Sequence, residues 1–485
     1  MANNTAISEL KNADPLFATL TIEIISIDAL KPFGTSARTH NDKQITKIAH
    51  SIEAFGFLTP ILIDDQNRII CGDGRVEALK KLGRPTVPSI RIDHLSEDQK
   101  RAYVIADNRL AELAGWDNET LAIELQHLTS VDLDFEIGVI GFETAEIDLL
   151  IGDAAQEAEA EEENVLPDLV TETVSKSGDL WLLGNHRLLC GDALDPDCYM
   201  RVLGGEQADM VFTDPPYNVP VDGHVCGKGK IKHREFVMAS GEMSDEEFEA
   251  FLLRIMQNLT RCAKDGAILD VCMDWRHLEP LLAAGRKVDL CLLNLCVWNK
   301  DNGGMGSLYR SKHELVCIFK KGSCKHKNNV ELGRYGRYRT NVWDYAGVNS
   351  MRKGRLEELA LHPTVKPVAL VSDAILDVTD RGDIVLDPFS GSGTTMIAAE
   401  KTGRRACTIE LDPAYVDVSI KRFETLYGIE AIHADTGKTF SEIEAARKAA
   451  VHELETDGAT PQTRPRPPGA STLDAQDCAS IEGEL

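Results

Sequence analysis

The feature that most constrains the fold is a regular alternation of strand-like and helix-like runs in the second half of the chain. Short apolar runs end at Thr213, Leu386 and Ile409, and runs of helical length and pattern lie between them. Alternation of this kind builds a mostly parallel sheet covered by helices. With 43% hydrophobic residues, the 485-residue chain can also bury large cores. We therefore predict an α/β fold for this half.

Composition divides the rest of the chain. Between Asp153 and Thr173 there are eight acidic residues and no Lys or Arg, which predicts a solvated, acidic linker. Strand-like runs around the turn Gly72-Asp73-Gly74-Arg75 predict a small α+β domain near the N-terminus. We expect the following parts: a first domain at 18–115, a helical extension at 116–152, the acidic linker at 153–175, the main α/β domain at 176–440 and a disordered tail at 455–485.

Charge and cysteine usage exclude several classes of protein. The net charge of −26 rules out a uniformly basic nucleic-acid coat. No apolar run is long enough to span a membrane, so we predict a cytoplasmic protein without membrane association. The twelve cysteines form no Cys-x-x-Cys pair, and we expect reduced thiols and no metal site.

The first chemical motif is Asp214-Pro215-Pro216-Tyr217, which directly follows the apolar run that ends at Thr213. Open α/β sheets bind ligands at the carboxyl ends of their strands. A carboxylate and a proline-held carbonyl can both accept hydrogen bonds from an amino group, while Tyr217 can stack on a flat ring. The exocyclic amine of adenine or cytosine fits this arrangement.

The second motif is Asp387-Pro388-Phe389-Ser390-Gly391-Ser392-Gly393, placed between a strand-like run and an alanine-rich helix. Two glycines allow close approach of a ligand, but no Lys follows them as a phosphate loop requires. Asp387 instead suits a cationic group, and Glu410, at the end of the next strand-like run, suits ribose hydroxyls. S-Adenosylmethionine satisfies both acids.

Together these motifs resemble the amino-group DNA methyltransferases of the β type over about Gly178 to Lys438. The resemblance implies a Rossmann-like, circularly permuted methyltransferase domain with S-adenosylmethionine as cofactor. It implies that Asp214, Pro215, Pro216 and Tyr217 are catalytic. Further segments match at Gly191-Asp192 and at His362-Pro363-Thr364-Val365-Lys366-Pro367. The cofactor-binding residues implied are Asp192, Thr364, Lys366, Asp387, Phe389, Gly391, Gly393 and Glu410.

The expected reaction is direct methyl transfer to the N6 amino group of adenine in duplex DNA, on a base flipped out of the helix. An Asp at position 214 favours adenine by family habit, and N4 methylation of cytosine is the alternative. A third possibility is a non-catalytic DNA-binding protein. For a site-specific enzyme of this kind, a homodimer and a cognate restriction enzyme are also possible partners.

A local basic segment is the predicted DNA-binding surface. Residues 300–366 hold 14 Lys and Arg against six acids, a net charge of +8. The family inserts its target-recognition region between the catalytic and cofactor halves, and 300–361 falls there. Guanidinium groups interleaved with aromatic rings suit phosphate contact and base stacking. The DNA-binding candidates are Lys325, Lys327, Arg334, Arg337 and Arg339.

The first domain carries a second resemblance. Cys71-Gly72-Asp73-Gly74-Arg75, with Asp107-Asn108-Arg109 after it, resembles the N-terminal domains of ParB-like proteins over about Ala18 to Gly115. Members of that group bind DNA or a nucleotide. Arg75 is either a phosphate ligand or a structural partner at a helix start.

Overall fold

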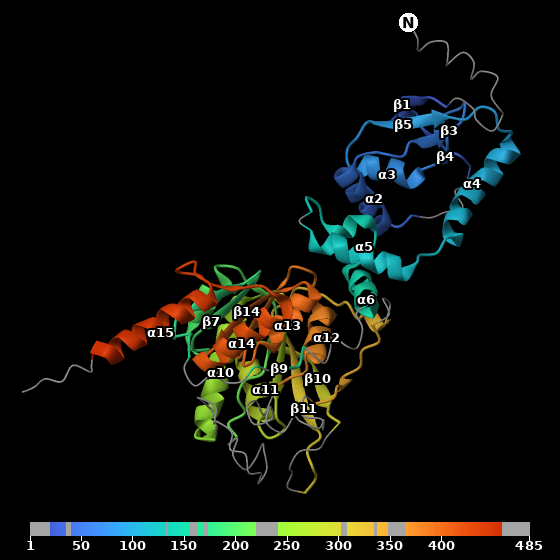
Figure 1. Ribbon diagram of the computed structural model, residues 1–485. Coiled ribbons are helices and arrows are strands. Elements are labelled where there is room, and N and C mark those ends of the chain that lie inside the picture. The colour runs from blue at the N-terminus through green and yellow to red at the C-terminus, as the bar shows by residue number, and fades with distance from the viewer. Residues whose placement is uncertain are drawn as a thin grey trace, which may run out of the picture.

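The computed structural model describes residues 20–34, 40–131, 133–154, 163–165, 167, 173–219, 241–301, 308–333, 337–347 and 365–457. These residues form a five-stranded sheet near the N-terminus and a ten-stranded sheet in the second half, with helices between and around them (Figure 1). None of the helices in this described part is long and apolar enough to cross a membrane.

The N-terminal sheet has the strand order β1-β5-β3-β4-β2 and mixes parallel with antiparallel pairs. Its strands are β1 (Ile22–Ser26), β2 (Lys31–Pro32), β3 (Ile61–Ile63), β4 (Arg68–Cys71) and β5 (Thr86–Arg91). Its helices are α2 (Asp42–Phe55), α3 (Asp73–Lys81) and α4 (Glu97–Leu113). The turn between β3 and β4 forms because Asp64 Oδ1 accepts hydrogen bonds from the backbone N–H groups of Gln66 and Arg68. The result is the predicted small α+β domain.

The large sheet has the strand order β12-β10-β11-β9-β8-β13-β14-β7-β6-β15. From one edge to the other, its strands are β12 (Val342–Asp344), β10 (Cys291–Asn299), β11 (His313–Lys320), β9 (Ala263–Met273), β8 (Ala208–Thr213), β13 (Ile384–Asp387), β14 (Arg405–Glu410), β7 (His186–Cys190), β6 (Leu180–Leu183) and β15 (Ala431–His433). The five strands from β9 to β7 are parallel, and all four residues of β13 are buried. Continuous burial is typical of a parallel strand covered on both faces. The predicted α/β fold is confirmed.

Helices cover both faces of this sheet. One core contains residues of α12 (Val368–Val378), α13 (Thr394–Thr402), α14 (Pro413–Tyr427) and α15 (Phe440–Asp457). The other contains residues of α8 (Pro196–Leu203), α10 (Asp245–Cys262) and α11 (Leu278–Lys287). A sheet between two helical layers leaves the carboxyl ends of its parallel strands open to ligands.

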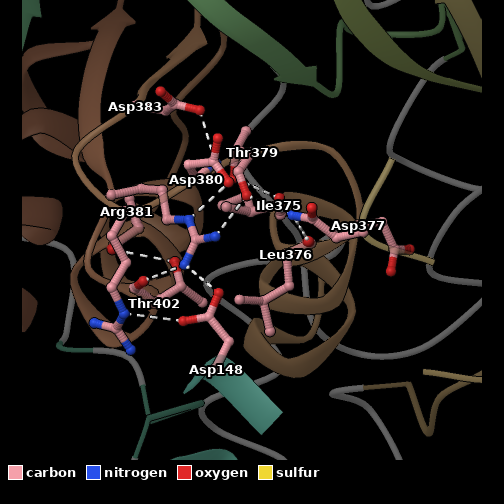
Figure 2. Close-up of polar contacts among 12 residues, drawn as sticks. Asp148, Ile375, Leu376, Asp377, Thr379, Asp380, Arg381, Asp383 and Thr402 are labelled. Atoms are coloured by element: carbon pink, nitrogen blue, oxygen red, sulfur yellow. Dashed lines mark hydrogen bonds and ion pairs between the residues drawn. The ribbon is translucent and has the colours of Figure 1, made fainter. Parts of the chain in front are cut away.

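Helices α5 (Asn118–Ser130) and α6 (Thr144–Ala154) connect the two sheets (Figure 1). The Asp148 carboxylate of α6 reaches the large domain, where it pairs with Arg381 at 3.0 Å and with Arg404 at 2.9 Å (Figure 2). Arg404 also donates to the carbonyl of Thr379 at 2.6 Å and to its hydroxyl at 3.0 Å. Asp148 and Arg404 are buried and Arg381 is half-buried, so α6 contacts the large domain through largely desolvated charges.

The acidic segment 153–175 differs from the solvated linker that its composition predicts. Among its described residues, Glu163 pairs with Lys401 at 2.7 Å, and Asn164 accepts from the backbone N–H of Val368. The N–H groups of Val174 and Ser175 both donate to the Asp417 carboxylate. These contacts neutralise or bury part of the acidic run, which local composition does not reveal. Residues 458–485 of the predicted tail lie outside the described residues.

Candidate active site

Three acidic residues stand at the carboxyl ends of three neighbouring parallel strands. Asp214 follows β8, Asp387 ends β13 and Glu410 ends β14. Because β13 pairs with β8 on one side and β14 on the other, both predicted motifs reach the same edge of the sheet. They line one pocket, which opens to solvent. Its lining includes Asp214, Pro215, Pro216, Tyr217, Lys366, Asp387, Phe389, Gly391 and Glu410.

Asp214 is held by two side chains. The Tyr217 hydroxyl donates to its Oδ1 atom at 2.5 Å, and the Lys366 ammonium pairs with its Oδ2 atom. Burial raises the pKa of Asp214, while the charge of Lys366 opposes that rise. Burial alone would lower the pKa of Lys366, but the carboxylates of Asp214 and Glu314 raise it. Asp214 is therefore placed as a half-buried hydrogen-bond acceptor beside a charged lysine.

Asp387 connects the end of β13 to the turn that follows. Its Oδ1 atom accepts from the Thr213 hydroxyl and from the N–H of Phe389, each at 3.0 Å, and its Oδ2 atom accepts from the Thr395 hydroxyl at 2.6 Å. A carboxylate has about four acceptor positions, so one remains on Oδ2 for a ligand. Burial raises the pKa of Asp387 to about 6.

Glu410 binds the same turn from the next strand. Its Oε2 atom accepts from the N–H of Gly391 at 2.8 Å, and its Oε1 atom accepts from the N–H of Asp412 at 2.9 Å. Each oxygen keeps one acceptor position, which matches a pair of hydroxyl groups. Burial raises the pKa of Glu410 to about 7. Among the residues that the structure describes, neither Asp387 nor Glu410 forms an ion pair with a basic side chain, so the two acids fit a ligand that carries positive charge and vicinal hydroxyls.

The two glycines of the turn have different roles. Gly391 has a φ of 53°, and a Cβ atom there would meet nothing within 4 Å, so it borders open pocket space. Gly393 has a φ of 82°, and a Cβ atom would lie 3.0 Å from the Ser419 side chain. Gly393 therefore allows close packing against α14 and is not part of the pocket lining, which differs from its predicted cofactor contact.

Other predicted cofactor residues have different surroundings. Asp192 accepts from the N–H of Leu194 and is not in the pocket lining, although its neighbour Ala193 is. Lys366 lines the pocket, but its charge is directed at the Asp214 carboxylate. The carboxylates of Asp214 and Glu314, both half-buried, compensate by their opposite charge for the loss of solvent around the buried Lys366 ammonium. Thr364 lies outside the described residues.

The structure gives two of the three predicted DNA-binding arginines, Arg337 and Arg339, protein partners. Arg337 is buried and pairs with Asp377 at 2.7 Å and with Asp373 at 3.2 Å. Arg339 pairs with Asp377 at 3.0 Å, and its guanidinium lies over the Trp343 ring. Both arginines thus attach their segment to α12 instead of facing DNA.

The remaining basic candidates divide between paired and exposed residues. Lys327 pairs with Asp380 at 2.9 Å and with Asp383, which also favours a structural role. Lys325 is exposed, and Arg334 lies outside the described residues. In the first domain, Arg75 donates to the carbonyls of Thr59 and Pro60, which favours the structural interpretation of that residue.

Sequence reasoning missed three residues of the site. Glu314, in β11, pairs with Lys366 at 2.9 Å and contacts the Tyr217 hydroxyl at 3.3 Å. Asp412 and Tyr415 line the pocket beyond Glu410. The sequence does carry signals for them. Asp412-Pro413 is typical of a helix start, and a single Glu within the apolar run 313–319 indicates a charged residue with a specific partner.

Comparison with known proteins defines the class of each part. Residues 208–421 match the family model described as DNA methylase, residues 119–177 the ParB-methyltransferase HTH domain, and residues 12–109 the ParB N-terminal domain. The chain thus contains a DNA methylase domain that follows two ParB-type domains in the sequence.

Curated relatives cover about half of this chain. Type II methyltransferase M.HinfI of Haemophilus influenzae is 26% identical over 254 residues, which are 50% of this chain and 69% of that protein. DNA adenine methyltransferase YhdJ of Escherichia coli (strain K12) is 26% identical over 262 residues, which are 49% of this chain and 82% of that protein.

Solved structures match at lower identity. The putative DNA modification methylase TTHA0409 from Thermus thermophilus, complexed with S-adenosyl-L-methionine, has 23% identity and a TM-score of 0.35, and the match covers 52% of this chain and 96% of that one. The PvuII DNA methyltransferase (cytosine-N4-specific) has 17% identity and a TM-score of 0.39, with 57% and 94% covered.

The family match and the pocket together identify the enzyme class. Residues 208–421 are a DNA methylase domain, so the class is that of enzymes that methylate DNA. The acidic end of the pocket at Asp387 and Glu410 fits S-adenosylmethionine, which carries a sulfonium, an ammonium and two ribose hydroxyls.

Proposed function

We propose that this enzyme is a site-specific methyltransferase for the N6 amino group of adenine in duplex DNA. The observation that carries the proposal is the shared pocket, in which an amine acceptor, Asp214, and the acids that fit the cofactor, Asp387 and Glu410, lie at the ends of adjacent strands. A relative named as an adenine methyltransferase supports the choice of base.

In the proposed mechanism the protein positions a flipped base and accepts from its amino group. Asp387, Gly391 and Glu410 would hold S-adenosylmethionine, which supplies an electrophilic methyl group when bound. The Asp214 carboxylate and the Pro215 carbonyl accept hydrogen bonds from the two N–H groups of the target amine, which localises the nitrogen lone pair for in-line attack. After transfer, the methylated nitrogen gives one proton to Asp214, and Asp214 then releases that proton to solvent. Tyr217 and the prolines keep Asp214 in place.

The test is nucleoside analysis of duplex DNA after incubation with the protein and S-adenosylmethionine. N6-methyladenine is the expected product. N4-methylcytosine would replace the adenine proposal by the alternative, and no methylated nucleoside would favour the non-catalytic interpretation. Because DNA is the substrate, we also propose a cytoplasmic location. A homodimer and a restriction partner stay predictions.

A further inference from the structure

Asp214 is surrounded by a chain of alternating charges that the proposed mechanism does not use. Lys366 lies between the carboxylates of Asp214 and Glu314, and Glu314 also pairs with Lys300. All four side chains are at least partly buried, and that of Lys366 is only 6% exposed. Two acids and two bases make this quartet electrically neutral.

The Lys366 ammonium creates a problem for the proposed acceptor. Oδ1 of Asp214 takes the Tyr217 hydroxyl and Oδ2 takes Lys366, so a target amine meets a carboxylate whose charge is already matched. An acceptor that is paired with a cation attracts a further donor less strongly. It also stabilises less well the positive charge that develops on the nitrogen during methyl transfer.

Glu314 can offset this pairing because of where it lies. Glu314 is fixed in β11, where it pairs with Trp298 of the neighbouring strand β10. Its Oε2 atom is 2.9 Å from Lys366 Nζ, and the same ammonium lies 5.7 Å from the centre of the Trp298 ring. Burial alone would raise the pKa of Glu314, but Lys366 and Lys300 hold it at about 2, so the side chain stays charged.

We propose that Glu314 is a positioning residue that takes up the charge of Lys366 and so leaves Asp214 free to accept the target amino group. This inference rests on the proposed function. Lys366 needs no large movement, since it already touches both carboxylates. When an amine occupies Oδ2, the ammonium keeps Glu314 and the faces of Trp298 and Tyr217 as partners.

The test variant is Glu314→Gln, which keeps the size of the side chain and removes its charge. Lys366 would then be balanced by Asp214 alone. We expect kcat for DNA methylation to fall roughly 10- to 100-fold, with the affinity for S-adenosylmethionine unchanged. The acid limb of the kcat–pH profile should move to lower pH, because an unshared Lys366 lowers the pKa of Asp214.

Three controls make the result specific. Glu279→Gln removes an exposed carboxylate at the start of α11 and should match wild type. Glu314→Asp keeps the charge, so we expect it to retain most of the activity and the acid limb of the wild-type kcat–pH profile. If Glu314→Gln does not fold, Glu314→Asp provides the test. When Lys366 is already replaced by Met, adding Glu314→Gln should reduce kcat little further, because the ammonium that Glu314 pairs with is absent.

The outcomes separate this inference from the function on which it rests. Wild-type kcat and pH profile in folded Glu314→Gln would overturn the role of Glu314, as would a loss in Glu314→Asp equal to that in Glu314→Gln. Failure of the wild-type protein to methylate DNA would instead overturn the proposed function.

Discussion

The Nη1 atom of Arg404 lies 2.9 Å from Oδ2 of Asp148, and this buried ion pair joins a helix of the ParB-type region to the methylase domain. The Asp148 side chain is 3% exposed and the Arg404 side chain is fully buried. Within α6, the Asp148 carboxylate supplies the charged contacts to the methylase domain, with Arg381 and Arg404 as its partners.

Replacement of Asp148 by Ala would leave Arg404 buried without its counter-charge. Loss of one partner of a buried pair costs about 3–5 kcal/mol. We expect α6 to detach from the methylase domain, with faster hydrogen exchange in 144–154 and a lower denaturation midpoint. Asp134→Ala changes an exposed carboxylate of the same region and serves as the control. Equal exchange rates in both variants would show that the ion pair does not hold the helix.

Arg337→Ala should reduce stability rather than DNA affinity. The substitution leaves the half-buried Asp377 with Arg339 as a guanidinium partner, so we expect a cost below the about 3–5 kcal/mol of a wholly unpaired buried charge. We expect a lower free energy of unfolding and an unchanged slope of DNA affinity against salt concentration. For Lys325→Ala, at an exposed position, we expect no change in stability. A flatter salt slope for folded Arg337→Ala would return this arginine to the DNA surface.

These arginines show where sequence reasoning stops. Arg337 and Asp377 are 40 residues apart, and nothing in the local pattern of Arg and Tyr indicates that a later helix supplies two carboxylates. The basic composition was visible, but its partners depend on tertiary packing. The same holds for Lys366 and Asp214, which are 152 residues apart.

The central site was more predictable because its geometry follows from a general rule. Parallel strands place their carboxyl ends at one edge, so Asp214, Asp387 and Glu410 had to converge once the strands were recognised. The predicted run 208–213 is β8 itself, and the predicted strand 405–409 lacks only Glu410 of β14. Asp192 and Gly393 are not in the pocket lining because each serves its own loop: Asp192 accepts from the N–H of Leu194, and Gly393 packs against Ser419 of α14.

Gly391→Ala should weaken cofactor binding. Its Cβ atom would enter open pocket space from a left-handed φ of 53°. Gly428 has a φ of 65° and equally open surroundings, but it ends α14 outside the pocket lining, so Gly428→Ala matches the strain without touching the ligand. Calorimetric titration should show weaker S-adenosylmethionine binding for Gly391→Ala only. Equal affinities would remove Gly391 from the cofactor site.

Cofactor affinity should increase with pH. Burial raises the pKa of Asp387 to about 6 and that of Glu410 to about 7, so both are partly protonated in slightly acidic solution. A bound cation favours the charged carboxylates, so binding releases protons and tightens as pH rises through this window. We expect the Kd for S-adenosylmethionine to fall roughly tenfold from about pH 5.5 to about pH 8.

Glu410→Gln provides the control for this pH dependence. Removal of that carboxyl should shrink the number of protons released, measured as the difference in binding heat between buffers of unlike ionisation enthalpy. An unchanged proton release in Glu410→Gln would assign the pH dependence to other groups.

The most direct measurement compares wild type with Asp214→Ala in methyl transfer to duplex DNA, followed by nucleoside analysis and by titration with S-adenosylmethionine. We predict N6-methyladenine from the wild type, at least ~100-fold slower transfer by Asp214→Ala, and equal cofactor affinity, because Asp387 and Glu410 are untouched. Transfer by Asp214→Ala at a rate near that of wild type would contradict the assignment of Asp214 as the acceptor of the target amine.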